Sequence, residues 1–316
     1  MPTLQPSEEG NVYLSDLSSS DKPWDAHRAA ADEVKNLYFL TEYIKYVKRI
    51  DECSRWLTFA LKAAEDGQVS FKLQDAKFCR VRHCPVCQWR RSLMWRARFF
   101  QVLPKVQEAY PTARWIFLTL TVKTCPLDEL RDTLALMNKA WQRLSQRKSF
   151  PALGFIKSVE VTRSQDGYAH PHFHCLLLVP AGYFGYGYIS QVKWADLWQS
   201  CLKVDYQPIV DVRAVKAKLK SGAADPEAGL FNAICETLKY SVKETDLVAD
   251  PIWLEGLTNQ LHKTRAIAIG GVLKNYLSEE EPEDLINAGI EDEEVEETDI
   301  KLLFDWAELV RRYRKK

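Results

Sequence analysis

Three of the six histidines in this 316-residue chain lie in one short stretch, "HPHFH", residues 170–174. A β-strand points alternate side chains to the same face, so His170, His172 and His174 would lie together on one face. Imidazole nitrogens two residues apart on a rigid strand can bind one divalent ion. The alternative is a row of histidines on a polar sheet surface, without a ligand. The pattern alone leaves both interpretations open.

A carboxylate is predicted opposite these histidines. The segment "GFIKSVEVTR", residues 154–163, is followed by the turn "SQDG" and then by the histidine strand, an order typical of a β-hairpin. A turn centred on residues 165 and 166 pairs Glu160 with His172 across the hairpin. Two histidines and one carboxylate on one sheet face form a donor set that leaves coordination positions open for a substrate.

A tyrosine lies downstream in a segment with helical periodicity, residues 227–244. On a helical wheel Tyr240 faces away from the apolar stripe, which consists of Phe231, Ile234, Cys235, Leu238 and Val242. A phenol has a pKa of about 10 and needs activation to act as a nucleophile. Glu236, one turn earlier, is a candidate general base for water, and Lys243 is a candidate partner for a phenolate or a phosphate. The alternative is an ordinary surface tyrosine.

Four cysteines have the spacing of a metal site. Cys79, Cys84 and Cys87 lie in "CRVRHCPVC", and Cys53 is the nearest upstream cysteine. A C-x₂-C pair without a thioredoxin-like strand and helix around it favours zinc over redox chemistry. A closed tetrahedral site needs a fourth ligand, for which Cys53 and the local His83 compete.

Basic and aromatic residues surround this cysteine segment, and no acidic residue occurs between positions 76 and 107. This composition fits contacts with phosphates and stacking on bases. The alternative is a solvated basic helix face whose tryptophans pack inward, and both descriptions can hold together. The candidate DNA-binding residues are Arg80, Arg82, Arg90, Arg91, Arg96, Arg98 and Trp89.

The elements that must position these groups alternate between strands and helices. Hydrophobic periodicity predicts a helix at 25–50, strands at 114–123, 154–163, 169–179 and 208–215, and further helices at 126–147, 190–203 and 227–244. This order predicts an α+β fold with a mainly antiparallel central sheet flanked by helices.

The net charge of zero conceals two regions of opposite charge. Residues 279–299 hold twelve acidic residues and no basic one, whereas residues 1–277 carry 37 Lys and Arg against 29 Asp and Glu. The basic excess fits a polyanionic partner. With no apolar run near the ~18 residues of a membrane span and no signal-peptide pattern, we expect a cytosolic protein without membrane contact.

Taken together, "FLTLT" (117–121), "HPHFH" (170–174) and "ETLKYSVK" (236–243) resemble the HUH endonucleases, and specifically the single-tyrosine plasmid rolling-circle replication initiators of bacteria. The resemblance extends from about Cys53 to Tyr276. It includes "KFCRVRHCPVCQWRRS" (77–92) and "HKTRAIAIGGVLKNYL" (262–277).

The resemblance implies a role for each site residue. His172 and His174 would bind Mg²⁺ or Mn²⁺, with Glu160 or His170 as the third ligand. Tyr240 would attack a phosphate of the plasmid origin, forming a 5′-phosphotyrosine and a free 3′-OH primer, and the strand would be rejoined at termination. Glu236 would activate water for the terminating cleavage.

Composition and periodicity, together with the resemblance, divide the chain. We expect a flexible arm (1–24), a helical and zinc-binding segment (25–110), an HUH nuclease domain (111–277), an acidic disordered segment (278–300) and a C-terminal basic helix (301–316). A host helicase is an expected partner, because the chain lacks the G-x-x-x-x-G-K-[ST] motif. One catalytic tyrosine per chain is compatible with a homodimer.

Three other functions fit parts of the pattern. An HUH transposase or relaxase would share the chemistry. A non-catalytic zinc protein would bind nucleic acid without cleaving it. A phosphodiesterase would use metal-bound water and would not depend on Tyr240.

Overall fold

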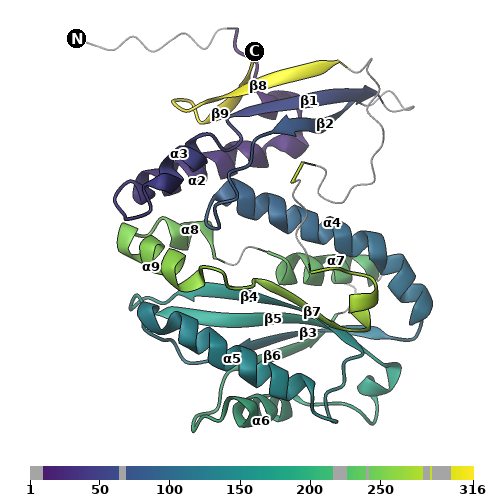
Figure 1. Ribbon diagram of the computed structural model, residues 1–316. Coiled ribbons are helices and arrows are strands. Elements are labelled where there is room, and N and C mark those ends of the chain that lie inside the picture. Colours follow the sequence, from purple (N-terminus) through teal and green to yellow (C-terminus); the bar gives the residue numbers. More distant parts are fainter. Residues whose placement is uncertain (1–9, 64–68, 216–225, 240–241, 280–284, 287–299) are drawn as a thin grey trace. The chain divides into compact units, whose positions relative to one another are not determined.

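The structure is a computed structural model that describes residues 10–63, 69–215, 226–239, 242–279, 285–286 and 300–316 (Figure 1). The chain divides into two compact units, one made of residues 1–90 and 284–316 and the other of residues 91–283. The boundary falls inside the long helix α4 (Pro85–Ala109). The fold is α+β, as the sequence predicts, and it contains two antiparallel sheets, of which the sequence predicts the larger.

The larger unit contains a five-stranded sheet in the order β6-β3-β5-β4-β7, with every pair of neighbouring strands antiparallel. Its strands are β3 (Arg114–Thr121), β4 (Gly154–Arg163), β5 (Ala169–Val179), β6 (Val210–Ala214) and β7 (Ile267–Gly271). Its other elements, apart from α4, are η2 (Leu127–Glu129), α5 (Leu130–Ser145), η3 (Ala181–Phe184), α6 (Gln191–Leu202), α7 (Pro226–Thr237), α8 (Glu244–Leu247), α9 (Pro251–Leu261) and η4 (Val272–Asn275).

The β4–β5 hairpin at the centre of this sheet has the predicted register. Glu160 pairs with His172, and the pairing runs without a bulge from Gly154–Leu178 to Arg163–Ala169. The turn is closed by hydrogen bonds from the Ser164 and Gly167 backbones, and Gly167 has a φ of 81°, a value that favours glycine. The turn chemistry therefore fixes which side chains of β4 and β5 meet.

The two faces of this sheet have different chemistry. One face carries Phe173 and Cys175 and packs on the tryptophans of α5 and α6, which include Trp141 and Trp198. The α5 stripe predicted from the sequence is buried there, because apolar residues three and four apart share one side of a helix. Helix α7 contacts β4 and β5. The histidine face also carries the buried Ile156, Leu176 and Leu178, so the candidate site occupies only one end of that face.

The smaller unit contains a four-stranded sheet in the order β2-β1-β8-β9. Its elements are α1 (Leu14–Leu17), η1 (Ser19–Asp21), α2 (Pro23–Tyr38), α3 (Lys45–Asp51), β1 (Trp56–Ala63), β2 (Val69–Ala76), β8 (Lys301–Ala307) and β9 (Arg312–Lys315). Strand β8 pairs with β1, so the C-terminal segment completes a sheet that starts near residue 56. Leu57 and Phe59 of β1 are buried in its core.

Three predictions about this unit are wrong in detail. Residues 301–316 form the hairpin β8–β9 and not a basic helix, because the buried Phe304 and Trp306 flank Asp305 at the two-residue spacing of a strand, and β8 pairs with β1. Within the predicted arm at 1–24, residues 1–9 lie outside the described residues. From Tyr13 onward the chain is ordered, with Tyr13 and Leu14 buried. The predicted helix at 25–50 is two helices, α2 and α3.

The predicted acidic segment, 278–300, lies mostly outside the described residues. Among the helices that the structure describes, none has the length and hydrophobicity needed to span a bilayer.

Candidate functional site

The three histidines of β5 lie on one sheet face, as the strand alternation predicts. The ring centroids of His170 and His172 are 4.2 Å apart, and those of His172 and His174 are 6.2 Å apart. His174 is buried between strands, with its ring stacked on Phe117 of β3. The rigid centre of the sheet therefore fixes the orientation of His174.

Glu160 contacts His174 directly. His174 Nε2 donates a hydrogen bond of 2.6 Å to Glu160 Oε2, and the Glu160 residue is 5% exposed. On the other side of the ring, Nδ1 lies 3.3 Å from the Thr119 hydroxyl. A tautomer with the proton on Nδ1 would donate to Thr119 and leave Nε2 free for an ion, the arrangement typical of histidine ligands. Thr119 is thus suited to support either state of His174.

The ring nitrogens of the other two histidines differ in their hydrogen bonds. His170 Nε2 donates to the Val122 carbonyl oxygen at 3.0 Å, which holds this ring to the backbone. His172 Nδ1 is buried without a hydrogen-bond partner. A buried unpaired nitrogen is costly unless a ligand satisfies it. Glu160 is therefore better placed than His170 to complete a set with His172 and His174.

Burial and neighbouring charges shift the pKa values of Glu160 and His172 in directions that favour cation binding. Burial alone would raise the pKa of Glu160, but the hydrogen bond with His174 and the charge of Lys239 lower the pKa to about 2. Burial, followed by the neighbouring His170, lowers the pKa of His172 to about 4. At neutral pH the site thus presents a carboxylate and a neutral imidazole, the states that bind divalent ions.

Lys239 connects this face to the segment after α7. Its Nζ lies 2.6 Å from Glu236 Oε1 and 3.2 Å from Glu160 Oε1. Burial alone would lower the pKa of Lys239, but the two carboxylates raise it. The sequence pattern does not distinguish this lysine. On the wheel of a continuous helix it had no distinctive position, because its role depends on where the helix ends.

The predicted helix at 227–244 is shorter than expected. Helix α7 ends at Thr237, and Val242 forms a parallel bridge with Val161 of β4. Phe231, expected on the packed stripe, is 51% exposed and stacks on Phe100. Val242 is therefore paired with β4 instead of lying on the apolar stripe of a helix.

The three predicted catalytic residues have different positions. Glu236 is in the last turn of α7 with a half-exposed side chain. Lys243 is exposed and precedes α8. Tyr240 lies outside the described residues.

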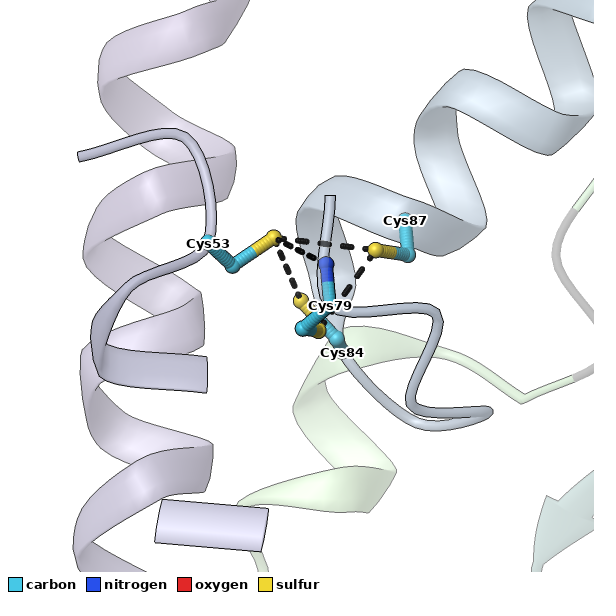
Figure 2. A group of neighbouring side chains, drawn as sticks. All are labelled: Cys53, Cys79, Cys84 and Cys87. Atoms are coloured by element: carbon cyan, nitrogen blue, oxygen red, sulfur yellow. Dashed lines mark hydrogen bonds between the residues drawn. The ribbon is translucent and has the colours of Figure 1, made fainter. Parts of the chain in front are cut away.

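The four cysteines converge in the smaller unit (Figure 2). The sulfur atoms of Cys53, Cys79, Cys84 and Cys87 all lie within 4.8 Å of one another, and all four residues are buried. Within the described part of the chain this is the one set of three or more such side chains that is so compact. His83, the competing fourth ligand, is not part of the set.

The spacing of the sulfur atoms fits a tetrahedral ion. Sγ–Sγ distances are 3.6 Å for Cys53–Cys87 and Cys79–Cys87, and 3.7 Å for Cys53–Cys84. Zinc–sulfur bonds of about 2.3 Å give a tetrahedral edge of about 3.8 Å. The backbone N–H groups of Cys79, Arg80 and Val81 donate to three of these sulfur atoms. These donors would stabilise thiolates, so the cluster is compatible with a bound metal.

The basic residues after the cysteines divide by environment. Arg80 is exposed, whereas Arg82, Arg91 and Arg98 are half-buried. Arg98 lies over the Trp95 ring, with its guanidinium carbon 5.1 Å from the ring centroid. Of this set, Arg80 offers the most surface to a polyanion.

Trp89, Arg90 and Arg96 are engaged in packing. Trp89 is 8% exposed and stacks on His27 with ring centroids 4.7 Å apart. Arg90 donates to the carbonyl oxygens of Leu285 and Ile286, and Arg96 donates to the Ser92 hydroxyl. These contacts favour the alternative in which the aromatic residues of this segment pack inward.

Comparison with known proteins identifies relatives over most of the chain. The replication protein family matches residues 70–314. "Protein rep" of Bacillus amyloliquefaciens is 35% identical, over 97% of this chain and 98% of its own length. "Protein rep" of Streptococcus pneumoniae is 34% identical over 87% of this chain and 86% of its own length, and that of Lactiplantibacillus plantarum is 38% identical over 70% and 74%. No solved structure matches. The chain therefore belongs to the replication protein family, as its resemblance to the plasmid rolling-circle initiators predicted.

Proposed function

We propose that this replication initiator is an HUH-type nuclease that nicks one strand of its plasmid origin with Tyr240 as the nucleophile. The observation that carries the proposal is the anchoring of both flanks of Tyr240 to strand β4. Lys239 pairs with Glu160, and Val242 bridges to Val161. Four residues span at most about 14 Å of extended chain, so the two anchors limit how far from β4 the chain that carries Tyr240 can extend.

The proposed reaction is a transesterification. The Tyr240 oxygen attacks the scissile phosphorus and forms a phosphate ester, while the bond from phosphorus to the 3′ oxygen breaks. The phenol loses one proton and the departing 3′ oxygen gains one, leaving a 3′-OH that primes synthesis. Attack of a 3′-OH on the phosphotyrosine reverses the step and closes the strand. No net oxidation or hydrolysis occurs in either direction.

Residues of the sheet would hold the divalent ion of this reaction. His172, His174 and Glu160 would bind Mn²⁺ or Mg²⁺, and the bound ion would polarise the scissile phosphate. The unpaired Nδ1 of His172 and the ionised Glu160 support this donor set. Imidazole ligands suit Mn²⁺ better than Mg²⁺, which prefers oxygen.

Glu236 and Lys243 would assist Tyr240. The Glu236 carboxylate would accept a proton from water during the terminating cleavage. Lys243 would hold a phosphate or the phenolate by its charge. Both lie within four residues of Tyr240 in the chain.

The smaller unit would bind the origin and hold zinc. Four buried cysteine sulfurs at tetrahedral spacing favour zinc over an oxygen-seeking ion. Arg80, with support from Arg82, would contact phosphates there, and Arg91 and Arg98 are separate candidates in the larger unit. A host helicase and a second copy of the chain are the proposed partners, and the bacterial cytoplasm is the proposed location.

Cleavage of labelled single-stranded origin DNA tests the nucleophile. Wild type should form a protein–DNA adduct on a denaturing gel with Mn²⁺ and none with EDTA, and Tyr240→Phe should form none. The matched control is Tyr168→Phe, which removes an exposed hydroxyl in the hairpin turn beside the histidine strand and should retain the adduct. Cleavage that persists in Tyr240→Phe would favour metal-bound water. Origin binding without any cleavage would favour a non-catalytic zinc protein.

A further inference from the structure

The Lys239 ammonium occupies a position at which a divalent cation would also be stable. It bridges two carboxylates, at 3.2 Å from Glu160 Oε1 and 2.6 Å from Glu236 Oε1. The Glu160 side chain is 6% exposed, so water compensates little of its charge. A buried carboxylate without a counter-charge is strongly destabilising. Lys239 therefore supplies the positive charge that Glu160 needs when no metal ion is bound.

The donor set is not closed around an ion while this bridge exists. Glu160 Oε1 faces Lys239, Glu160 Oε2 accepts from His174, and the buried Nδ1 of His172 has no partner. Unlike the cysteine sulfurs, the possible ligand atoms of these described side chains do not all lie within 4.8 Å of one another. Binding of an ion to Glu160 and His174 thus requires Glu160 to exchange one cation for another.

We propose that Lys239 is a positioning residue that competes with the divalent ion for Glu160. Entry of the ion breaks the weaker of the two contacts and leaves Lys239 on Glu236, to which it is closer. The competition couples metal binding to the position of the segment that leads into Tyr240. This inference rests on the metal role of Glu160 in the proposed function.

The coupling is reciprocal. If the ion displaces Lys239 from Glu160, then removal of the Lys239 charge must tighten binding of the ion. A purely structural role of Lys239 predicts the opposite, because loosening the segment after α7 would disorder the site and weaken binding. The sign of the change in metal affinity therefore separates the two roles.

Mn²⁺ affinity provides the readout, measured by electron paramagnetic resonance of free Mn²⁺ on full-length protein loaded with zinc. Lys239→Met should bind Mn²⁺ roughly tenfold tighter than wild type, given the repulsion between nearby cations at partly buried sites. Lys239→Arg, which keeps the charge, should bind as wild type does. Lys139→Met removes an exposed lysine from α5 and should leave the affinity unchanged. Circular dichroism checks that each variant is folded. Lys239→Gln removes the charge but keeps hydrogen-bonding groups, and it should also bind Mn²⁺ more tightly than wild type.

The outcomes separate this inference from the function on which it rests. The competition alone is overturned if folded Lys239→Met and Lys239→Gln bind Mn²⁺ as tightly as wild type or more weakly. This outcome requires that wild type binds Mn²⁺ and that Glu160→Gln does not. If Glu160→Gln does not change the Mn²⁺ affinity, or if wild type binds no Mn²⁺, both the competition and the metal role of Glu160 are overturned. Tighter binding in both variants, with Lys239→Arg near wild type, supports the competition.

Discussion

Individual side chains on the histidine face have unequal roles that their spacing does not reveal. His170, His172 and His174 alternate regularly along β5, yet His170 is tied to a backbone carbonyl and His174 to Glu160. His172 has a buried nitrogen without a hydrogen bond. Hydrogen-bond partners therefore distinguish His172, a proposed metal ligand, from the neighbouring His170.

This difference predicts unequal effects of two histidine substitutions. His172→Ala should weaken Mn²⁺ binding by about 100-fold, whereas His170→Ala should weaken it by less than about tenfold, as for a residue outside the ligand set. Calorimetric titration of both variants with Mn²⁺ measures the two effects. An equal loss in the two variants would assign His170 to the ligand set.

Lys157 is a buried charged side chain on the sheet face opposite to Glu160. Lys157 Nζ lies 3.7 Å from the centre of the Phe173 ring and donates to Asn138 Oδ1. Burial lowers the pKa of Lys157 to about 8. The unfolded chain therefore binds more protons than the folded chain between pH 8 and 10.5, and stability rises with pH in that window. Below pH 8 the charged lysine lowers the stability of the fold.

Lys157→Met should accordingly stabilise the protein at pH 7, by on the order of 2 kcal/mol. The advantage should shrink as the pH rises toward 10.5, because wild type then loses the buried charge. Urea unfolding at pH 7 and pH 10 tests both statements, with the exposed Lys139→Met as the control. A stability difference that does not change with pH would show that the effect comes from packing and not from charge.

Local elements differ in how far the sequence determines them. The β4–β5 hairpin follows from its turn and its alternation, so the pairing of Glu160 with His172 was predictable. Helix α7 was predicted too long, because the contact of Val242 with β4 lies outside the local sequence pattern. Lys239 was missed for the same reason. The metal ligands could thus be proposed from local sequence, and the cation that contacts Glu160 could not.

The cysteine-bearing segment combines exposed and structural arginines, which should respond differently to substitution. Arg80→Ala should weaken DNA binding and reduce the slope of log affinity against log salt by about 1. Its thermal stability should stay near that of wild type, because Arg80 is exposed. Arg90→Ala should instead lower the melting temperature, since Arg90 donates to two backbone carbonyls. An unchanged salt slope in Arg80→Ala would remove it from the DNA-binding surface.

The cysteine cluster should determine the stability of its unit through a bound metal. Wild type and Cys201→Ala, which alters a buried cysteine of the other unit, should each bind one zinc ion per chain. Cys84→Ala should bind less. A zinc chelator should lower the stability of the first two proteins by on the order of several kcal/mol. Zinc analysis and thermal unfolding measure both effects, and stability that is insensitive to chelator in wild type would exclude a structural metal.

At the scale of the whole molecule, contacts distant in sequence determine the division of the chain. The C-terminal strands join the sheet that begins at β1, so the smaller unit is discontinuous in sequence. Local periodicity did not reveal this pairing, because strands separated by more than 200 residues leave no local signal. The α+β class and the central hairpin were predictable, since each depends on patterns within a few tens of residues.

Identification of the residue that bonds to DNA is the most direct test of the proposed function. Wild type would be incubated with single-stranded origin DNA and Mn²⁺, digested with nuclease and trypsin, and analysed by mass spectrometry. Trypsin cleaves after Lys239 and Lys243, so the nucleophile would lie in the four-residue peptide YSVK, residues 240–243. The proposed function predicts a nucleotide on Tyr240 in this peptide. A nucleotide on another tyrosine, or cleaved DNA without any modified peptide, would contradict it.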